Sequence, residues 1–301
     1  MKPLVLGTRG SDLALAQTRL VASRLRAAHP GLAVEEKIIR TTGDARLDVS
    51  LSEPGPLDKG LFTKDHEDAL LRGEIDAAVH SLKDLPTEQP AGLALGAILE
   101  REDPSDVLVS KLGGGIAALP EGAEAATSSL RRKRFLQWQR PDLRVLDIRG
   151  NVPTRIRKLA ESGSLAALVL ADAGLRRLRT AGVELALDGL HVSQLDFMLP
   201  APGQGAIAVE CRIGEEAAAL AAIHHAETAA CVHAERAVLA GLGGGCHLPL
   251  GARAQVLGEI LSLRAAWFGE GSAEPRTADS SGPAADWAAT AAAAISQLRA
   301  S

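Results

Sequence analysis

The sequence predicts an α/β protein with mainly parallel sheets, followed by a small α+β domain with an antiparallel sheet. The chain has 301 residues, a length that accommodates two domains or three small ones. Short apolar runs alternate with glycine or Ser/Thr turns and with helical patterns, and this alternation is typical of parallel sheets. After Pro200 the pattern changes to a strand, a helix, a hairpin and a closing helix, which predicts the separate small domain.

The first strand, turn and helix unit lies at the N-terminus. An apolar run over residues 3–8 predicts a strand, and the helical spacing of apolar residues between 13 and 25 predicts a helix that Ser11 caps. Residues 33–40 predict the next strand. Residues 43–60 have no clean period and contain two prolines and three glycines. We expect a long surface loop there, and such loops are usually functional or disordered.

The rest of the α/β part repeats this unit. A helix from about Thr63 to Arg72 precedes a strand that stops at the charged turn of Lys83 and Asp84. Three further units follow, over residues 122–138, 143–161 and 165–182.

The middle of the chain is strongly basic. Residues 127–180 hold 13 Lys and Arg but only 4 Asp and Glu, a net charge of +9, whereas the rest of the chain carries −13. A basic block on an acidic background suggests an anionic partner for that block.

Charged and hydroxyl side chains stand at or just after the ends of the predicted strands. They are Arg9, Lys83, Asp84, Ser129, Arg131, Arg132, Arg149 and Arg177. Ligands of parallel sheets bind off the carboxyl ends of the strands, and guanidinium groups bind carboxylates or phosphates in a bidentate manner. We therefore expect a pocket for a ligand with several negative charges. A small polycarboxylate fits better than nucleic acid, because only Phe135 and Trp138 in the basic segment could stack on bases.

The composition indicates the compartment. The N-terminus has one lysine and a short apolar run, so we expect no signal peptide, and no apolar window is long enough for a membrane span. Three cysteines without a CxxC motif indicate neither a disulfide framework nor a ribbon-type zinc site. We expect a cytoplasmic protein with reduced thiols.

The three cysteines are not equivalent. The strand over residues 206–214 places Ile207, Val209, Cys211 and Ile213 on one apolar face, and Cys231 shares helical spacing with apolar neighbours, so both thiols are expected to be buried. Cys246 belongs to no such period.

Cys246 follows three glycines, whose open backbone allows a ligand to approach closely or a nest of N–H groups to favour a thiolate. The stretch is equally compatible with a tight loop that holds an incidental cysteine. A zinc site of Cys246, His247 and His233 matches no standard ligand spacing. For Asp84 the residues alone also permit an N-cap or an ion pair with Lys83.

A set of motifs occurs in one order along almost the whole chain, from Leu6 to about Trp267. The motifs are LGTRGSDLALAQ, KGLFTK, AVHSLKDLP, EREDPSD, TSSLRRKRFLQ, IRGNVPTR, LPAPGQGAIAVECR, HHAETAACVHAER and GGGCHLPLG. Together they closely resemble the hydroxymethylbilane synthase family, also called the porphobilinogen deaminase family.

The resemblance implies three domains. Domain 1 comprises residues 1–99 and 200–216 and domain 2 comprises residues 100–199. Both resemble the halves of a type II periplasmic binding protein, with the active site between them. Domain 3, residues 217–301, is small and carries Cys246.

The resemblance also implies the reaction. The family joins four porphobilinogen molecules head to tail, releases four ammonia molecules and yields hydroxymethylbilane for tetrapyrrole and haem synthesis. The matching cysteine, Cys246, would hold a dipyrromethane cofactor by a thioether bond, and Asp84 matches the family's catalytic carboxylate. By resemblance the cofactor and substrate are bound by Arg9, Ser11, Lys59, Phe62, Ser81, Lys83, Thr127, Ser128, Ser129, Arg131, Arg132, Arg149, Arg155 and Arg177.

The chain departs from the family pattern at several positions. Gly243 and His247 replace the glutamate and glutamine that often flank the cysteine. His66 stands where an apolar residue is common. Asp172 replaces a small apolar residue and could pair with Arg176.

The competing interpretation is a non-catalytic cytosolic protein whose two sheet domains close on an anion. In that case Cys246 and Asp84 would have no role in ligand affinity. For either interpretation we expect a monomer that binds no metal, nucleic acid or membrane.

Overall fold

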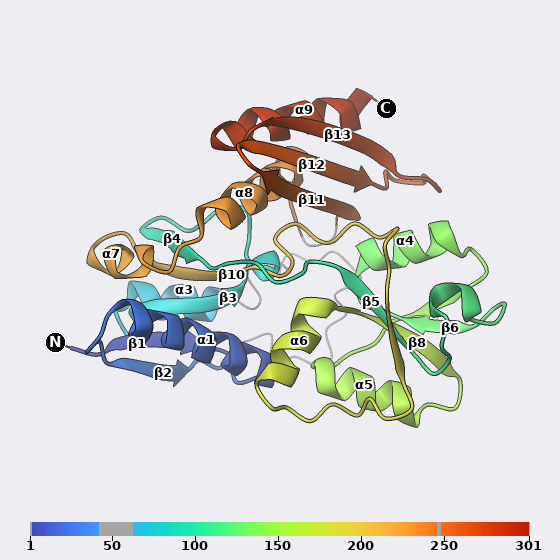
Figure 1. Ribbon diagram of the computed structural model, residues 1–301, viewed down its shortest axis with the longest axis horizontal. Helices are drawn as coiled ribbons and strands as arrows, with labels where there is room; N and C mark the ends of the chain where they lie inside the picture. Colours follow the sequence, from blue (N-terminus) through green and yellow to red (C-terminus); the bar gives the residue numbers. More distant parts are fainter. Residues whose placement is uncertain (1, 42–62, 246–247, 301) are drawn as a thin grey trace.

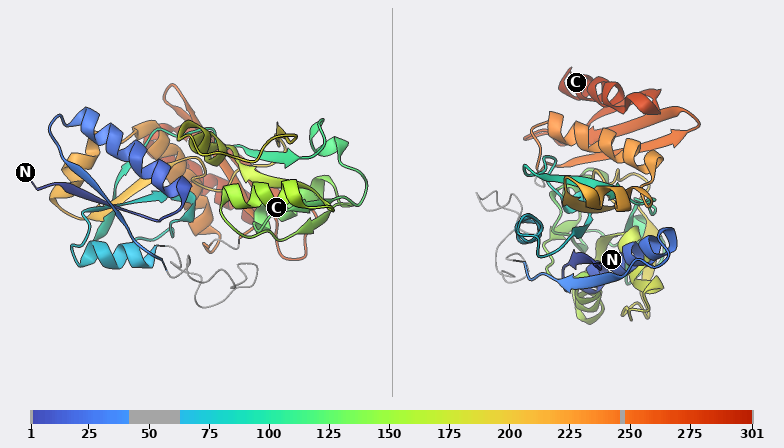
Figure 2. Two further views of the ribbon diagram at one scale, coloured as in Figure 1. Left: turned by 90° about the horizontal axis from the view of Figure 1, so that it is seen from below. Right: turned by 90° about the vertical axis from the view of Figure 1, so that its left-hand side faces the viewer.

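The structure is a computed structural model, and it describes residues 2–41, 63–245 and 248–300. It contains two five-stranded mixed sheets and one three-stranded antiparallel sheet. Figure 1 shows the two larger sheets side by side, with the third sheet above them. The right-hand view of Figure 2 shows the C-terminal helix on the far side of the third sheet from the N-terminus.

The first sheet has the strand order β2-β1-β3-β10-β4. Its strands are β1 (Leu4–Thr8), β2 (Val34–Ile38), β3 (Ala77–Ser81), β4 (Leu93–Ile98) and β10 (Ile207–Arg212). β1 pairs in parallel with β2 and β3, whereas β10 runs antiparallel to both of its neighbours. The helices of this part are α1 (Asp12–Ala28), α3 (Lys64–Leu71), α7 (Glu215–Ala221) and the 3-10 turn η1 (Leu82–Asp84).

The second sheet repeats this arrangement with the order β7-β6-β8-β5-β9. Its strands are β5 (Asp106–Ser110), β6 (Glu124–Ala126), β7 (Arg144–Leu146), β8 (Leu165–Ala171) and β9 (His191–Gln194). Here β5 is the antiparallel strand, between β8 and β9. The helices are α4 (Leu130–Gln139), α5 (Val152–Glu161), α6 (Asp172–Thr180) and the 3-10 turn η2 (Gly115–Ala118).

The third sheet is built from consecutive antiparallel strands, β11 (Leu250–Leu257), β12 (Ile260–Trp267) and β13 (Arg276–Pro283). Its helices are α8 (Ala226–Gly241), α9 (Trp287–Ala300) and the 3-10 turn η3 (Ala284–Asp286). One hydrophobic cluster joins this sheet to α8 and α9. The predicted fold class, two α/β units with mainly parallel sheets and a small antiparallel unit, is confirmed.

Two connecting segments, residues 99–105 and 195–206, run between the larger sheets. They lie against each other, because the Glu102 N–H donates to the Gly205 carbonyl at 3.2 Å. The antiparallel strands β5 and β10 directly follow these two segments, so each sheet receives one strand from the chain that has just left the other. The predicted domain boundaries at 99/100 and 199/200 fall in these segments, and the division itself stays a prediction.

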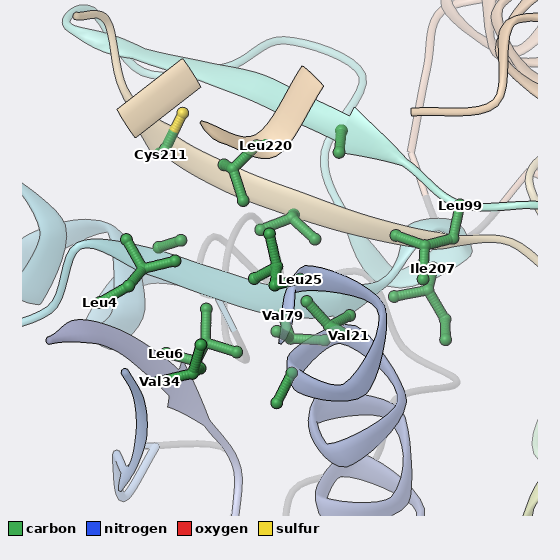
Figure 3. Packing of buried hydrophobic residues seen from close by; sticks show 14 residues of the cluster. Leu4, Leu6, Val21, Leu25, Val34, Val79, Leu99, Ile207, Cys211 and Leu220 are labelled. Carbon is green, nitrogen blue, oxygen red and sulfur yellow. The ribbon is translucent and has the colours of Figure 1, made fainter. Parts of the chain in front are cut away.

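Helix α1 packs on the first sheet through a core of apolar side chains. Figure 3 shows Val21 and Leu25 of α1 pointing toward the strands, where they meet Val79 and other fully or largely buried apolar side chains. Ser11 caps α1 as predicted, since its Oγ accepts from the Ala14 N–H at 3.4 Å. No helix in the described ranges combines the length and apolar character that a membrane crossing requires.

The predicted burial holds for two cysteines but not for an isoleucine near one of them. Cys211 and Cys231 are buried, and both predictions are confirmed. Ile213, expected on the same apolar face as Cys211, is 70% exposed and lies beyond the end of β10. That prediction is wrong. Because β10 is buried on both faces, the alternation of apolar and other residues along it does not show where the strand ends.

A buried polar cluster of Thr63, His66, His80 and Glu210 lies between α3 and the first sheet. His80 Nε2 lies 3.4 Å from Glu210 Oε2, but the Thr63 hydroxyl, the His66 ring and the Glu210 carboxylate have no hydrogen bond of normal geometry in the described structure. Burial lowers the pKa of His66 to about 4, and the charges of His80 and Arg9 act in the same direction. His66, one of the departures from the family pattern, is therefore a neutral polar side chain in an apolar position.

We predict that His66→Leu raises the free energy of unfolding by about 1–2 kcal/mol, because it removes a buried polar group without good hydrogen bonds. The gain should grow as the pH falls from 6.5 toward 4, since in this window the unfolded chain binds a proton on His66 and the folded chain does not. Urea titrations on either side of this window measure the effect. His191→Leu, at an exposed position on β9, is the control. A variant no more stable than wild type at the lower pH contradicts the prediction.

Candidate active site

The candidate site forms where strands of both larger sheets end and helices begin. Helices α1, α4 and α5 begin with side-chain caps from Ser11, Ser129 and Asn151. A helix N-terminus carries unpaired N–H groups and a partial positive charge, so these starts favour anions. The Leu13 side chain of α1 stands 3.7 Å from the place where a Cβ on Gly174 of α6 would lie, which puts the two sheets' helices in contact.

Asp84 closes the 3-10 turn that follows β3. The turn is held by the Leu85 N–H, which donates to the Leu82 carbonyl, and by the Leu82 N–H, which donates to the Ala206 carbonyl. The Asp84 side chain is exposed to solvent. Burial is the main cause that lowers the pKa values of Lys83 and Arg155, and the negative charge of Asp84 acts on both groups in the opposite direction.

Lys83 connects this turn to the second sheet. Its ammonium donates to Gln204 Oε1 at 3.4 Å, and the Gln204 amide nitrogen donates to Asp106 Oδ1 at 2.9 Å. Burial lowers the pKa of Lys83 to about 8, and the charge of Arg132 adds to this effect. Lys83 is thus a cation held close to other cations.

Asp106 is a fully buried carboxylate that holds two of the predicted arginines. Arg131 Nη1 donates to Asp106 Oδ2 at 2.6 Å, and Arg132 Nε donates to Oδ1 at 2.9 Å. Burial would raise the pKa of Asp106, but the charges of both arginines outweigh it and hold the pKa well below its usual range. Arg131 also donates to the Leu199 carbonyl at 2.6 Å.

Arg149 and Arg155 lie beyond the end of β7, at the start of α5. Arg155 Nε donates to the Gly150 carbonyl at 2.7 Å. The pKa of Arg155 is lowered to about 10, mainly by burial and also by the charges of Arg132 and Arg149. Three arginines therefore act on one another here, with Asp84 as the carboxylate that offsets them.

Arg177 follows the end of β8, as predicted, but stands within a helix: α6 begins directly after β8, and Arg177 lies in its second turn. Its Nη2 donates to the Gly205 carbonyl at 2.6 Å, while Nε has no hydrogen-bond partner in the described structure. Burial lowers its pKa to about 10. Its neighbour Arg176 instead pairs with Asp172 at 2.5 Å, the pairing that the departure from the family pattern suggested.

The predicted hydroxyl groups have local partners. Ser81 exchanges hydrogen bonds with the Gln17 amide at 2.9 and 3.2 Å. Thr127 Oγ1 accepts from the Ser129 N–H at 3.2 Å, and the Ser128 hydroxyl donates to the Ile148 carbonyl. These contacts shape the turn after β6.

Lys59, Phe62 and Cys246 lie outside the described residues, as does the loop predicted over residues 43–60. The chain that precedes Cys246 is described as far as Gly245. A Cβ on Gly244 would stand 3.5 Å from Thr87 Oγ1, three residues beyond Asp84. Gly244 has a φ of +58°, in the left-handed region that favours glycine. His233, named in the zinc alternative, stacks on Trp287 with ring centroids 5.3 Å apart.

The sequence reasoning missed several residues that build this site. Asp106 and Gln204 join the two sheets, and Arg236 donates to carbonyls of the Asp84 turn. Asp106 and Gln204 stand inside two of the quoted motifs, EREDPSD and LPAPGQGAIAVECR. Their position in those motifs could have indicated that Asp106 and Gln204 belong to the site. The sequence does not indicate which carboxylate is buried beside which arginine.

Comparison with known proteins supplies the family. The model for "Porphobilinogen deaminase, dipyromethane cofactor binding domain" matches residues 4–219, and the model for "Porphobilinogen deaminase, C-terminal domain" matches residues 229–281. Curated relatives named porphobilinogen deaminase include one from Syntrophomonas wolfei, 51% identical over 88% of this chain and 84% of its own. Another, from Rubrobacter xylanophilus, is 52% identical over 87% of this chain and 83% of its own.

Solved structures match more weakly. The chain resembles a Salmonella typhimurium periplasmic binding protein with a TM-score of 0.37 and 12% identity, over 74% of this chain and 90% of that one. A score this low supports no conclusion about the site. The family models cover most of the chain, and the curated relatives are about 50% identical to it over most of their length. The chain therefore belongs to the porphobilinogen deaminase family.

Proposed function

We propose that this chain joins four porphobilinogen molecules head to tail on a dipyrromethane held by Cys246, and releases hydroxymethylbilane and four ammonia molecules. As a member of its family the chain is a transferase of tetrapyrrole biosynthesis that works with a dipyrromethane cofactor. The order of the steps and the role of each residue are part of the proposal.

The observation that carries the proposal is the group of cations around Asp84. Burial lowers the pKa values of Lys83 and Arg155, and the positive charges of neighbouring arginines act in the same direction, so keeping these two groups charged is costly in the absence of a bound anion. Bound anions would relieve this repulsion. Each porphobilinogen carries an acetate and a propionate, so a growing chain of linked rings brings many carboxylates to this group.

The residues present fit a dipyrromethane. Its carboxylates need several cationic donors in one place, and the charge of Arg132 acts on both Lys83 and Arg155, while that of Arg149 acts on Arg155. The unpartnered Nε of Arg131 is a further donor beside this group. When bound, the cofactor supplies the free pyrrole α-carbon to which the first substrate unit is joined. The glycines before Cys246 allow the loop to come close to the Asp84 turn, in keeping with the 3.5 Å that would separate a Cβ on Gly244 from Thr87 Oγ1.

The cations and Asp84 would have different roles in the reaction. Arg132, Arg149 and Arg155 bind ring carboxylates and orient the substrate. Positive charge develops on the substrate ring as ammonia leaves, and the Asp84 carboxylate would accept a hydrogen bond from the pyrrole N–H and so stabilise that charge. Arg9, Ser11, Lys59, Phe62, Ser81, Thr127, Ser128, Ser129, Arg131 and Arg177 complete the proposed binding set.

We also propose that the protein is a cytoplasmic monomer whose first two domains, with boundaries near 99/100 and 199/200, enclose the site. The non-catalytic anion-binding alternative uses the same cations. It assigns no chemistry to Cys246 or Asp84, so the experiments below separate it from the enzyme.

Intact mass tests the anchor. The wild-type protein is expected to exceed the mass of the bare chain by two linked pyrrole units, and Cys246→Ala is expected to show the bare mass. Cys231→Ala is the control and should keep the surplus, because its thiol is buried in α8. If wild type has the bare mass, incubation with porphobilinogen should add the surplus. If the mass does not increase after incubation, the assignment of Cys246 as the cofactor anchor is wrong.

Asp84→Asn tests the catalytic carboxylate. The variant is expected to keep the two-pyrrole surplus and to lose about 10²–10⁴-fold in kcat, since the amide cannot stabilise the cation or take a proton. Glu88→Gln, at an exposed carboxylate four residues away, is the control and should keep kcat. Near wild-type turnover of Asp84→Asn would remove this residue from the mechanism.

The pH profile tests Lys83. Its charged form, which binds carboxylates, is lost as the pH rises through about 8, so kcat/KM for porphobilinogen should fall across that value. Lys83→Arg should move the fall to higher pH, because a guanidinium stays charged. Lys133→Arg on α4 is the matched control and should leave the profile unchanged. An unchanged profile for Lys83→Arg would show that another group titrates.

A further inference from the structure

One guanidinium, that of Arg236 on α8, contacts the turn that carries Asp84 at three backbone carbonyls. Arg236 of α8 donates to the carbonyls of Leu82 at 3.3 Å, Leu85 at 3.0 Å and Pro86 at 2.5 Å. Its side chain is 7% exposed. These carbonyls flank Lys83 and Asp84 on both sides, so the contacts restrain the backbone on which the two charged side chains stand.

The helix that bears Arg236 is itself fixed in place. The adjacent Glu235, which is fully buried, accepts from both terminal nitrogens of Arg101 at 2.7 and 2.9 Å. It also accepts from the Gly203 and Ala254 N–H groups, each at 2.8 Å. Four hydrogen bonds to one buried carboxylate tie α8 to the connecting segments and to β11, so α8 lies firmly between the first and third sheets (Figure 1).

The same helix leads to the loop of Cys246. α8 ends at Gly241, and the Gly244 N–H still donates to the Leu239 carbonyl at 2.9 Å. At Gly244 the chain passes near Thr87, just beyond the Asp84 turn, since a Cβ added there would stand 3.5 Å from Thr87 Oγ1. One rigid helix therefore holds the turn through Arg236 and begins the loop through its last turn.

We propose that Arg236 is a positioning residue: it fixes the backbone of the Asp84 turn to α8, and so sets the place of the Asp84 carboxylate relative to the loop that carries Cys246. This inference rests on the proposed roles of Asp84 and Cys246. An arginine suits this place because its fork donates to several carbonyls at once, whereas lysine offers a flexible point charge.

The chain contains a comparable contact elsewhere. Arg140 donates to the Ile116 carbonyl at 2.7 Å and to the Leu119 carbonyl at 3.1 Å, and so holds the 3-10 turn η2 of the second sheet. Unlike Arg236, it also donates to both carboxylate oxygens of Asp142, each at 2.7 Å. No proposed site residue stands on η2. Arg140→Gln therefore removes the same kind of contact without touching the Asp84 turn.

The experiment compares Arg236→Gln, Arg236→Lys and Arg140→Gln in the full chain with its cofactor. Arg236→Gln is expected to keep the two-pyrrole surplus by intact mass and to lose about 10–100-fold in kcat with little change in KM, since small misplacements of a reacting group have effects of this size. Arg236→Lys should recover part of the loss. Hydrogen exchange of residues 82–87 should quicken in both Arg236 variants and stay unchanged in Arg140→Gln.

A double variant separates positioning from general loss of stability. In the Asp84→Asn background, Arg236→Gln should lower kcat little further, because the group that it positions is already gone. Full multiplication of the two effects, or wild-type kcat in Arg236→Gln, overturns the proposal. If Asp84→Asn alone keeps turnover, the proposed role of Asp84 has failed instead, and the exchange rates still report whether Arg236 holds the turn. Where Arg236→Gln does not fold, Arg236→Lys carries the same comparisons.

Discussion

The site depends on one buried carboxylate, Asp106 at the start of β5. It accepts hydrogen bonds from Arg131, Arg132 and Gln204, and Gln204 accepts in turn from Lys83. Without Asp106 two guanidinium groups would lie buried side by side, and an uncompensated buried charge costs about 3–5 kcal/mol. The carboxylate therefore allows cations from both larger sheets to gather at one place, and its position immediately after a connecting segment joins that place to the segments between the sheets.

Two buried polar clusters, one around Glu235 and one around His66 and Glu210, differ in how well their polar atoms are hydrogen-bonded. Around Glu235 every hydrogen bond is satisfied, and the cluster joins α8 to three other segments. Around His66 and Glu210 the polar atoms lack good hydrogen bonds, and the cluster lies below α3. A satisfied network gives rigidity, whereas an unsatisfied one costs stability. The rigid cluster lies beside the Asp84 turn, where the proposed chemistry needs fixed geometry.

The local elements of the fold were predictable because their signals are local. The helical spacing and Ser11 cap of α1, the turn after β3, the three basic strand and helix units and the hairpin of β11 and β12 all occur where the patterns indicate them. Strands β4, β5, β9 and β13 were not predicted. β5 is buried at every position, so a short apolar run carries no alternation, and β9 and β13 are largely polar runs that become strands only by pairing with a neighbour.

The sequence by itself determined which charged residues are available and, through the ordered motifs, the family and its reaction. It could place arginines at strand ends because the carboxyl ends of parallel strands share an edge. Only the tertiary structure decided which charges meet. Asp106 is near Arg131 in space but 25 positions away in the chain, and Arg236 lies 151 positions from the Leu85 carbonyl that it holds. Such pairings arise when separate elements pack together, and no local pattern records them.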